Sequence, residues 1–388
     1  MTEQVKVPEI RFAGFTDPWE QRKFSDIVDV CSGKDYKHLE EGPIPVYGTG
    51  GFMTSVDEAL SYDRDAVGIG RKGTIDKPYL LKAPFWTVDT LFYAIPKSDM
   101  DLEFVHCSFL NVDWKSKDES TGLPSLSKEA INETIALVPS FNEQSRLGEF
   151  FSDLDSLITL HQRKYDKLVV FKKSMLEKMF PKDGESVPEI RFAGFTDPWE
   201  QRKLGDVASS FDYGLNAAAT EYDGQNKYLR ITDIDDETHE FSKSDLTTPL
   251  ADLAMSADYL LKESDLLFAR TGASVGKTYL YRQFDGMVYF AGFLIRARIG
   301  EGADPEFAYQ ATLTDAYKKY VAITSQRSGQ PGVNAQEYAD YQLMLPSKTE
   351  QQQIGMTLRS LDDLITLHQR KLELLQNIKK SLLDKMFV

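Results

Sequence analysis

Apolar residues recur with a four–three spacing in two long segments of the chain. In the first segment the spacing runs from Leu147 to Leu168, and in the second it runs from Ile354 to Leu375. A sustained four–three alternation is typical of a coiled-coil seam, where one stripe of a helix faces a partner helix. We therefore expect two long helices that pair antiparallel. The seam residues of this prediction are Leu154, Ile158, His161, Tyr165, Leu168, Leu361, Ile365, His368, Leu372 and Leu375.

Both seams change their spacing at the same place. After Leu168 and Leu375 the next predicted seam residue comes three positions later, at Phe171 and Ile378, although the alternation calls for four. A shortened step of this kind is a stammer, which locally alters the winding of a coiled coil. We expect this local change in both helices.

Two segments of the chain are duplicated without a change. Val7–Lys23 is repeated at Val187–Lys203, 180 positions later, and Leu157–Lys164 is repeated at Leu364–Lys371, 207 positions later. Two copies are too few for a solenoid and instead indicate a tandem pair of units, each with a head, a body and a helix. We expect the head to be an ordered structural turn. The predicted division is 1–145 and 183–352 for the two domains, and 146–182 and 353–388 for the helices.

The two bodies, 24–140 and 204–347, differ in sequence. Both contain short strand-like runs separated by turn signals, and the growth of the repeat offset gives the second body 27 more residues. This pattern predicts an α+β fold, with two pseudo-twofold-related mixed α/β domains joined by the two long helices. The clearest strand-like runs are Ala66–Ile69, Leu91–Ile95, Leu266–Ala269 and Phe293–Ile299.

Bulk composition narrows the class of protein only slightly. Hydrophobic residues make up 41% and charged residues 27% of the chain, which is ordinary for a globular protein. The net charge of −15 argues mildly against nucleic acid, but phosphate binding depends on local patches. The N-terminus has no apolar core of a signal peptide, and no run is long enough to span a membrane. We expect a cytoplasmic protein without membrane contact.

Two glycine-rich segments imitate nucleotide-binding motifs. Gly68–Gly73 has the spacing GxGxxG, but a proline follows at Pro78, where the dinucleotide fingerprint needs a helix to begin. Gly272–Thr278 resembles a phosphate loop but has three residues between its glycines, where the motif has four. We expect neither segment to bind a nucleotide. The two cysteines, Cys31 and Cys107, are too few for a metal cluster, so no metal site is expected.

The order of these motifs resembles the specificity subunit of type I restriction–modification systems. The resemblance covers essentially the whole chain. It rests on the openings FAGFTDPWEQRKF and FAGFTDPWEQRKL, on the helices that share LITLHQRK, on the endings KKSMLEKMF and KKSLLDKMF, and on IPVYGTGGF and GIGRKGTI. It implies two target-recognition domains that each read half of a bipartite double-stranded DNA site. The helices would set the spacing and dock two modification subunits, with restriction subunits as further partners.

Candidate DNA contacts come from polar loops of the two bodies. Arg71–Gly73 aligns with Arg270–Gly272, and an Arg before a glycine-containing turn can reach a guanine edge or a phosphate. A plain surface turn with an exposed arginine is the alternative. The candidates are Arg71, Lys72, Gly73, Thr74, Tyr47, Thr49, Arg230, Arg270, Thr271, Ser274, Lys277, Arg327, Ser328 and Gln330.

The sequence contains no recognisable catalytic constellation. We therefore expect a non-catalytic subunit without a cofactor of its own. The resemblance implies that S-adenosylmethionine, ATP and magnesium belong to the partner subunits. The alternative function is a scaffold that presents two protein-binding domains on a coiled coil and binds no DNA.

Overall fold

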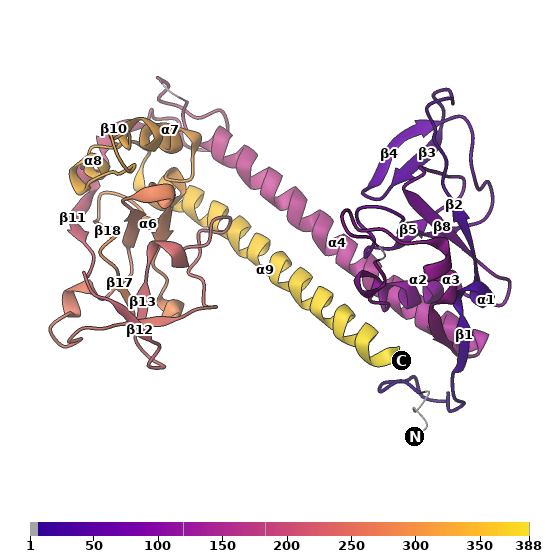
Figure 1. Ribbon diagram of the computed structural model, residues 1–388. Coiled ribbons are helices and arrows are strands. Elements are labelled where there is room, and N and C mark those ends of the chain that lie inside the picture. Colours follow the sequence, from indigo (N-terminus) through magenta and orange to yellow (C-terminus); the bar gives the residue numbers. More distant parts are fainter. Residues whose placement is uncertain (1–6, 119, 183, 388) are drawn as a thin grey trace. The chain divides into compact units, whose positions relative to one another are not determined.

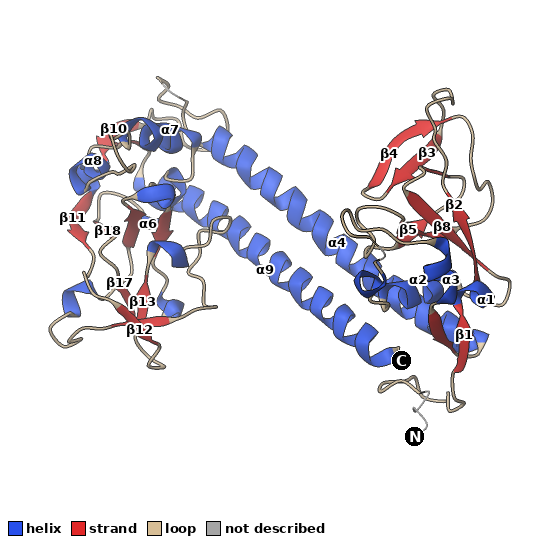
Figure 2. Ribbon diagram, in the orientation of Figure 1, coloured by secondary structure: helices blue, strands red, loops and turns tan. Residues whose placement is uncertain are grey.

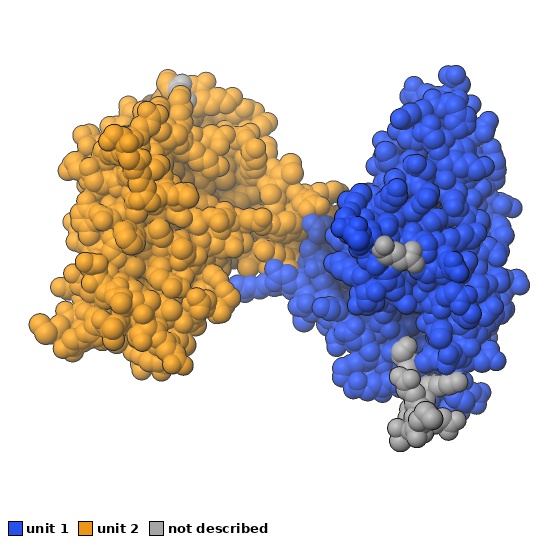
Figure 3. Space-filling model, in the orientation of Figure 1, with its two compact units in different colours: residues 1–162, 370–388 blue, residues 163–369 orange. Residues whose placement is uncertain are grey.

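The computed structural model describes residues 7–118, 120–182 and 184–387. The chain divides into two units (Figure 3). Unit 1 contains residues 1–162 and 370–388, and unit 2 contains residues 163–369. Unit 1 therefore combines two separate stretches of the chain, whereas unit 2 is one continuous stretch.

The two predicted long helices are present and are shared between the units. They are α4 (Phe141–Met179) and α9 (Lys348–Met386), the long magenta and yellow helices of Figure 1. Each helix begins five residues before its predicted boundary, at 141 instead of 146 and at 348 instead of 353. The seam pattern places the boundary too late because the first turns of both helices bind the heads and do not join the seam.

The body of unit 1 is built on a four-stranded antiparallel sheet with the order β2-β8-β5-β6. A three-stranded sheet, β4-β3-β7, and a two-stranded sheet, β1-β9, complete it (Figure 2). The strands are β1 (Glu20–Lys23), β2 (Val28–Ser32), β3 (Ile44–Gly48), β4 (Gly51–Val56), β5 (Ala66–Gly70), β6 (Tyr79–Leu81), β7 (Trp86–Thr87), β8 (Leu91–Pro96) and β9 (Ile135–Val138). The helices are α1 (Phe24–Ile27), α2 (Leu102–Leu110), the 3-10 helix η1 (Trp114–Lys117) and α3 (Lys128–Glu133).

The body of unit 2 repeats this plan with the four-stranded antiparallel sheet β11-β18-β15-β16. The two-stranded sheets β12-β14, β13-β17 and β10-β19 accompany it. The strands are β10 (Glu200–Lys203), β11 (Ala208–Tyr213), β12 (Ala219–Glu221), β13 (Lys227–Leu229), β14 (Thr247–Pro249), β15 (Asp265–Ala269), β16 (Thr278–Leu280), β17 (Val288–Phe290), β18 (Leu294–Ile299) and β19 (Gln342–Leu345). The helices are α5 (Leu204–Val207), α6 (Pro305–Ala311), α7 (Asp315–Thr324), α8 (Ala335–Ala339) and the 3-10 helices η2 (Ile231–Asp233), η3 (Ala257–Tyr259), η4 (Gly272–Ser274) and η5 (Gln283–Asp285).

The central strands read as continuous apolar runs because both faces of the sheet are covered. In β15, Leu266 and Phe268 belong to the core that includes the long helices, whereas Leu267 and Ala269 belong to a second core on the opposite face. Successive residues of a strand point to opposite faces, so the run divides its side chains between the two cores. This arrangement confirms the predicted α+β class and the predicted strand-like runs.

Each head is fixed to the first turn of a long helix. In unit 1, Arg11 donates from Nε and Nη2 to the two carboxylate oxygens of Glu143, at 2.6 and 2.7 Å. In unit 2, Arg191 binds Glu350 in the same way, at 2.6 and 2.8 Å. The predicted structural role of the duplicated head is confirmed.

Each head also contacts the end of the other long helix in its unit. The Trp19 ring lies 6.0 Å from the Phe387 ring, after the end of α9, and Ile10 N–H donates to the Lys385 carbonyl. In unit 2, the Trp199 ring lies 6.1 Å from the Phe180 ring, after the end of α4. One head therefore joins the beginning of one helix to the end of the other.

Within each unit the two helix segments run antiparallel. In unit 1, the ring of Phe151 lies 5.9 Å from that of Phe387, and four residues further along α4 Asp155 binds Lys379, earlier in α9, at 2.6 Å. In unit 2, the equivalent Lys172 of α4 binds Asp362 of α9. All the predicted seam residues are half-buried, which supports the predicted seam.

The predicted stammer is wrong. Phe171 and Ile378 are exposed by 51% and 39%, so they do not belong to the seam. Lys172 and Lys379 occupy the seam instead, with side chains exposed by only 13% and 17%, and this restores the uninterrupted four–three spacing. A lysine is tolerated there because an aspartate of the facing helix pairs with its ammonium group.

Candidate nucleic-acid interface

An arginine follows the central strand of each body. We call Arg71–Gly73 arginine loop 1 and Arg270–Gly272 arginine loop 2. Loop 1 comes directly after β5, and loop 2 comes directly after β15. The strands occupy equivalent places in the two four-stranded sheets, so the loops leave the sheets at equivalent points.

Backbone hydrogen bonds fix arginine loop 1 between two other segments. Arg71 N–H donates to the Thr90 carbonyl at 2.8 Å, and the Arg71 carbonyl accepts from Leu126 N–H at 2.9 Å. Gly73 N–H donates to the Pro124 carbonyl at 2.8 Å. Gly73 has a φ of +89°, a left-handed conformation that glycine adopts without steric cost.

Arginine loop 2 has the same three bonds. Arg270 N–H donates to the Phe293 carbonyl at 3.0 Å, and the Arg270 carbonyl accepts from Val333 N–H at 2.9 Å. Gly272 N–H donates to the Pro331 carbonyl at 3.0 Å, and the φ of Gly272 is +72°. The structure thus presents the two arginines in equivalent backbone frames, as their alignment in the sequence predicts.

The two arginine side chains lie on aromatic rings. The Arg71 guanidinium is 5.8 Å from the centre of the Phe92 ring, and its Nη1 makes a long 3.4 Å bond to the Asp89 carbonyl. The Arg270 guanidinium is 5.0 Å from the centre of the Tyr213 ring. Its Nε is buried and has no hydrogen-bond partner among the described residues. Stacking orients both guanidinium groups and leaves donors available for a ligand.

Two candidate residues of unit 1, Tyr47 and Arg71, form hydrogen bonds with the same short segment, which connects β7 to β8. Val88 N–H donates to the Tyr47 carbonyl, and Thr90, two residues further on, accepts from Arg71. Lys72 is exposed, whereas Tyr47, Thr49 and Thr74 are half-buried. The structure therefore ties Tyr47 and Arg71 to the same short connection.

Acidic groups organise the loops that pair with the arginine loops. The backbone N–H groups of Ser125 and then Ser120 hydrogen-bond Asp118 and hold the pKa of that carboxyl below its usual range. In unit 2, Glu337 accepts from Asn334 N–H and from Arg327. Both loops are thereby held in place beside the arginines.

Two candidate arginines already have carboxylate partners. Arg230 donates from Nε and Nη2 to Asp233 at 2.9 and 2.8 Å, and Arg327 donates to Glu337 at 2.6 Å. Both guanidinium groups therefore form ion pairs that stabilise the body of unit 2. Their predicted DNA contact stays a prediction.

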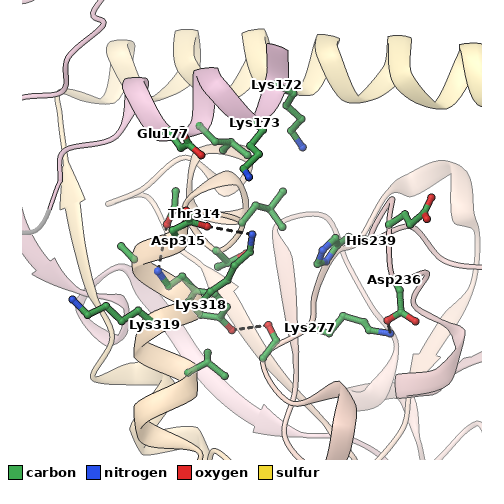
Figure 4. A pocket seen from close by; sticks show the side chains of 18 of the residues that line it. Lys172, Lys173, Glu177, Asp236, His239, Lys277, Thr314, Asp315, Lys318 and Lys319 are labelled. Atoms are coloured by element: carbon green, nitrogen blue, oxygen red, sulfur yellow. Dashed lines mark hydrogen bonds and ion pairs between the residues drawn. The ribbon is translucent and has the colours of Figure 1, made fainter. Parts of the chain in front are cut away.

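The remaining candidates of unit 2 divide between two places. Gln330 and Ser328 are exposed in the loop beside arginine loop 2, where half-buried Thr271 bridges to Gly332. Ser274 and Lys277 instead line a cavity of about 1350 Å³ beside α4 and α7 (Figure 4). There Lys277 binds Asp236 at 2.5 Å. The sequence places these residues in one loop with Arg270, but Arg270 is not among the residues that line the cavity.

Sequence reasoning missed several exposed apolar side chains near the candidate residues, such as Tyr213 beside Arg270 and Phe52 beside Tyr47. Phe293, whose carbonyl accepts from Arg270, is 57% exposed, and Tyr213 under the Arg270 guanidinium is 45% exposed. In unit 1, Phe52 and Met53 of the β3–β4 hairpin are exposed by 64% and 52%. Exposed aromatic residues in glycine-rich turns are the signal that could have identified them.

The described residues hold no group of three or more His, Cys, Asp or Glu side chains arranged to bind a metal ion. Among the same residues, no helix has the length and apolar character needed to cross a membrane. As expected, no helix begins in Gly68–Gly73: β5 ends at Gly70, and the next element of the chain is the strand β6.

Comparison with solved structures supports the fold. The chain is similar to the S subunit of a type I restriction-modification system from M. genitalium, with 15% identity, 98% coverage of this chain, 99% coverage of that chain and a TM-score of 0.69. It also resembles a chain from a structure of a type I R-M system assembly, with 13% identity, coverage of 95% and 97%, and a TM-score of 0.50.

Two curated proteins are similar in sequence. The type I restriction enzyme MjaVIII specificity subunit of Methanocaldococcus jannaschii is 23% identical over 70% of this chain and 65% of its own length. The putative type I specificity subunit S.MgeORF438P of Mycoplasma genitalium is 25% identical over 43% of this chain and 45% of its own length. The chain thus matches less than two thirds of the length of either relative.

A comparison with protein-family models matches two segments, residues 16–169 and 196–377, to the type I restriction modification DNA specificity domain. Together these segments contain both bodies and most of both long helices. The chain therefore belongs to the family of type I restriction modification DNA specificity proteins.

Proposed function

We propose that this chain is the non-catalytic DNA-specificity subunit of a type I restriction–modification complex that acts in the cytoplasm. Each body reads one half of a bipartite double-stranded DNA site through its arginine loop. The observation that carries this proposal is the equivalent backbone frame that presents Arg71 and Arg270 in two bodies of different sequence. An arginine whose donors are available can bond bidentately to guanine O6 and N7.

The long helices set the distance between the half-sites. Each helix has 39 residues, and a helix of that size is about 58 Å long at 1.5 Å per residue. This length corresponds to about 17 base-pair steps of B-DNA at 3.4 Å per step. A heptad inserted into both helices should lengthen the accepted spacer by about three base pairs and leave the half-sites unchanged.

The outer faces of the helices dock two modification subunits. Unit 1 exposes Leu157 and Leu160 by 41% and 47%, and unit 2 exposes the equivalent Leu364 and Leu367 by 43% and 45%. Exposed apolar groups at equivalent places favour two equivalent partners, because a partner that covers one set fits the other. Leu160→Glu should reduce the number of bound modification subunits from two to one, as measured by native mass spectrometry.

The reaction chemistry belongs to the partners in this proposal. S-adenosylmethionine is expected on the modification subunits, and ATP and magnesium are expected on the restriction subunits. Equilibrium binding of each cofactor to the isolated chain and to the assembled complex tests this assignment, because only the complex should bind them.

Mapping methylated adenines in DNA from cells that express the complex tests the central proposal. The expected result is one bipartite sequence. Exchange of residues 24–140 for the body of another family member should change only one half of that sequence. A complex that methylates no defined sequence, and whose DNA binding shows no steep loss with added salt, would instead support the scaffold alternative.

A further inference from the structure

We propose that the residue whose carbonyl accepts the N–H of the loop arginine determines specificity in each body. This residue is Thr90 in unit 1 and Phe293 in unit 2. In unit 2 the geometry points to contact between the Phe293 ring and the 5-methyl group of a thymine beside the guanine bound by Arg270. The inference rests on the proposed DNA recognition by arginine loop 2.

Phe293 is held rigidly although its ring is exposed. It lies in the turn between β17 and β18, where its neighbours Ala291 and Leu294 are buried and Leu294 N–H donates to the Ala291 carbonyl. Its own carbonyl receives Arg270 N–H at 3.0 Å. The backbone of this turn therefore presents a large apolar ring to solvent directly beside the arginine.

Arg270 is held in one orientation by a second aromatic residue. Tyr213 pairs with Ile295 across β11 and β18, two positions from Phe293, and its ring lies under the Arg270 guanidinium at 5.0 Å. Ala335 N–H donates to the Tyr213 hydroxyl at 3.3 Å, which ties the ring to the start of α8, two residues after Val333. Stacking fixes the plane of the guanidinium without using its hydrogen-bond donors.

The combination of a free arginine and an exposed phenyl ring selects a chemical pattern in the major groove. Guanine offers two acceptors, O6 and N7, that match the arginine, and thymine offers a methyl group that a Phe side chain can cover. Cytosine lacks that methyl group and a phenyl ring cannot bond to its amino group. Phe293 therefore favours thymine beside the guanine.

Thr90 gives unit 1 a different preference from the same position. Its side chain is half-buried and offers a hydroxyl group in addition to a methyl group. A hydroxyl can donate to or accept from a base edge, so Thr90 does not require a thymine. The residue at this one position therefore differs between the bodies and changes the preferred base, while the arginine beside it is the same in both.

Uracil substitution tests the proposal because it removes only the thymine methyl group. The complex with its modification subunits is titrated with duplexes in which each thymine of the unit 2 half-site is replaced in turn by uracil. At one thymine, wild-type affinity should fall about fourfold, which corresponds to about 0.8 kcal/mol for one methyl group. Phe293→Ser, which removes the ring and offers no methyl group, should bind the thymine and uracil duplexes equally.

Phe284→Ala is the matched control. Phe284 is 65% exposed in η5 of the same unit, and its removal should leave the discrimination between thymine and uracil intact. The inference would be overturned if the wild type bound every uracil duplex as tightly as the thymine duplex. A unit 2 half-site that contains no thymine would also overturn it. If Arg270→Ala also left recognition of that half-site unchanged, the proposed reading by arginine loop 2 would fail as well.

Discussion

Replacing Glu350 by glutamine should release the head of unit 2 from the first turn of α9. Glu350 is fully buried, and both of its carboxylate oxygens accept hydrogen bonds from Arg191, whose side chain is only 12% exposed. Glutamine keeps the shape of glutamate but turns an amide N–H₂ toward one guanidinium nitrogen. One of the two bonds is lost, and the guanidinium stays in place without a counter-charge.

The size of the effect follows from this burial. Removing one partner of a buried ion pair costs about 3–5 kcal/mol, and the slight exposure of Arg191 favours the lower end. At about 1.4 kcal/mol per factor of ten, a loss of about 3 kcal/mol lowers the protection of the head against exchange by about a hundredfold. The reporting amides are Ile190, which donates to the Lys178 carbonyl, and Trp199, which donates to the Ser186 carbonyl.

Hydrogen exchange followed by mass spectrometry is the suitable assay because it reports on each unit separately. A single free energy of unfolding is poorly defined for a chain of two units. The peptides must extend beyond Val187–Lys203, since that segment is identical to Val7–Lys23. Glu143→Gln is the matched control and should loosen only the head of unit 1. A loss of protection below threefold at Ile190 and Trp199, or an equal loss in both heads, would refute this account.

Three further outcomes are expected. Lys172→Met should lower the stability of unit 2 by about 2 kcal/mol, measured by hydrogen exchange of unit 2 peptides, because Asp362 then lacks its cation at the seam; the double variant with Asp362→Asn should recover part of the loss. Arg71→Ala and Arg270→Ala should each weaken binding to a different half-site by about 1–3 kcal/mol in competition assays, and equal loss at both half-sites would contradict separate readers. Burial lowers the pKa of His106 to about 4, so its contribution to stability is complete above pH 6.5 and is lost as the pH falls toward 4. The loss should amount to roughly 3 kcal/mol, measured by hydrogen exchange of unit 1 peptides, and should be absent in His106→Gln.

The long helices could be predicted from the sequence because a seam is a local pattern. The position of Lys172 could not, because a lysine is normally placed on the solvent side of a helix. Its partner Asp362 lies 190 residues further along the chain, and only the antiparallel pairing of α4 and α9 brings them together. The predicted stammer arose from reading Phe171 as a seam residue in place of its charged neighbour.

The arginine loops could also be predicted, since an arginine before a glycine turn occurs in both bodies. The proposed role of Thr90 and Phe293 could not be predicted in this way. Their contact with the arginines depends on how β5 pairs with β8 and β15 pairs with β18, which brings residues 19 and 23 positions apart together. Nothing in the local sequence around Phe293 specifies that register.

The heads are held by contacts between side chains, whereas the arginine loops of the bodies are held by backbone hydrogen bonds. This difference explains why the two heads are identical in sequence and the two bodies are not. The heads depend on side chains, because Arg11 and Arg191 must each fit a buried glutamate and Trp19 must meet an aromatic ring at the end of a helix. A changed side chain there would break the joint. The arginine loops depend on backbone hydrogen bonds to Thr90 in one body and Phe293 in the other, which do not specify the side chain of the acceptor residue. The residues that accept these bonds can therefore change while the frame stays the same, which is the property that the proposed exchangeable DNA reader needs.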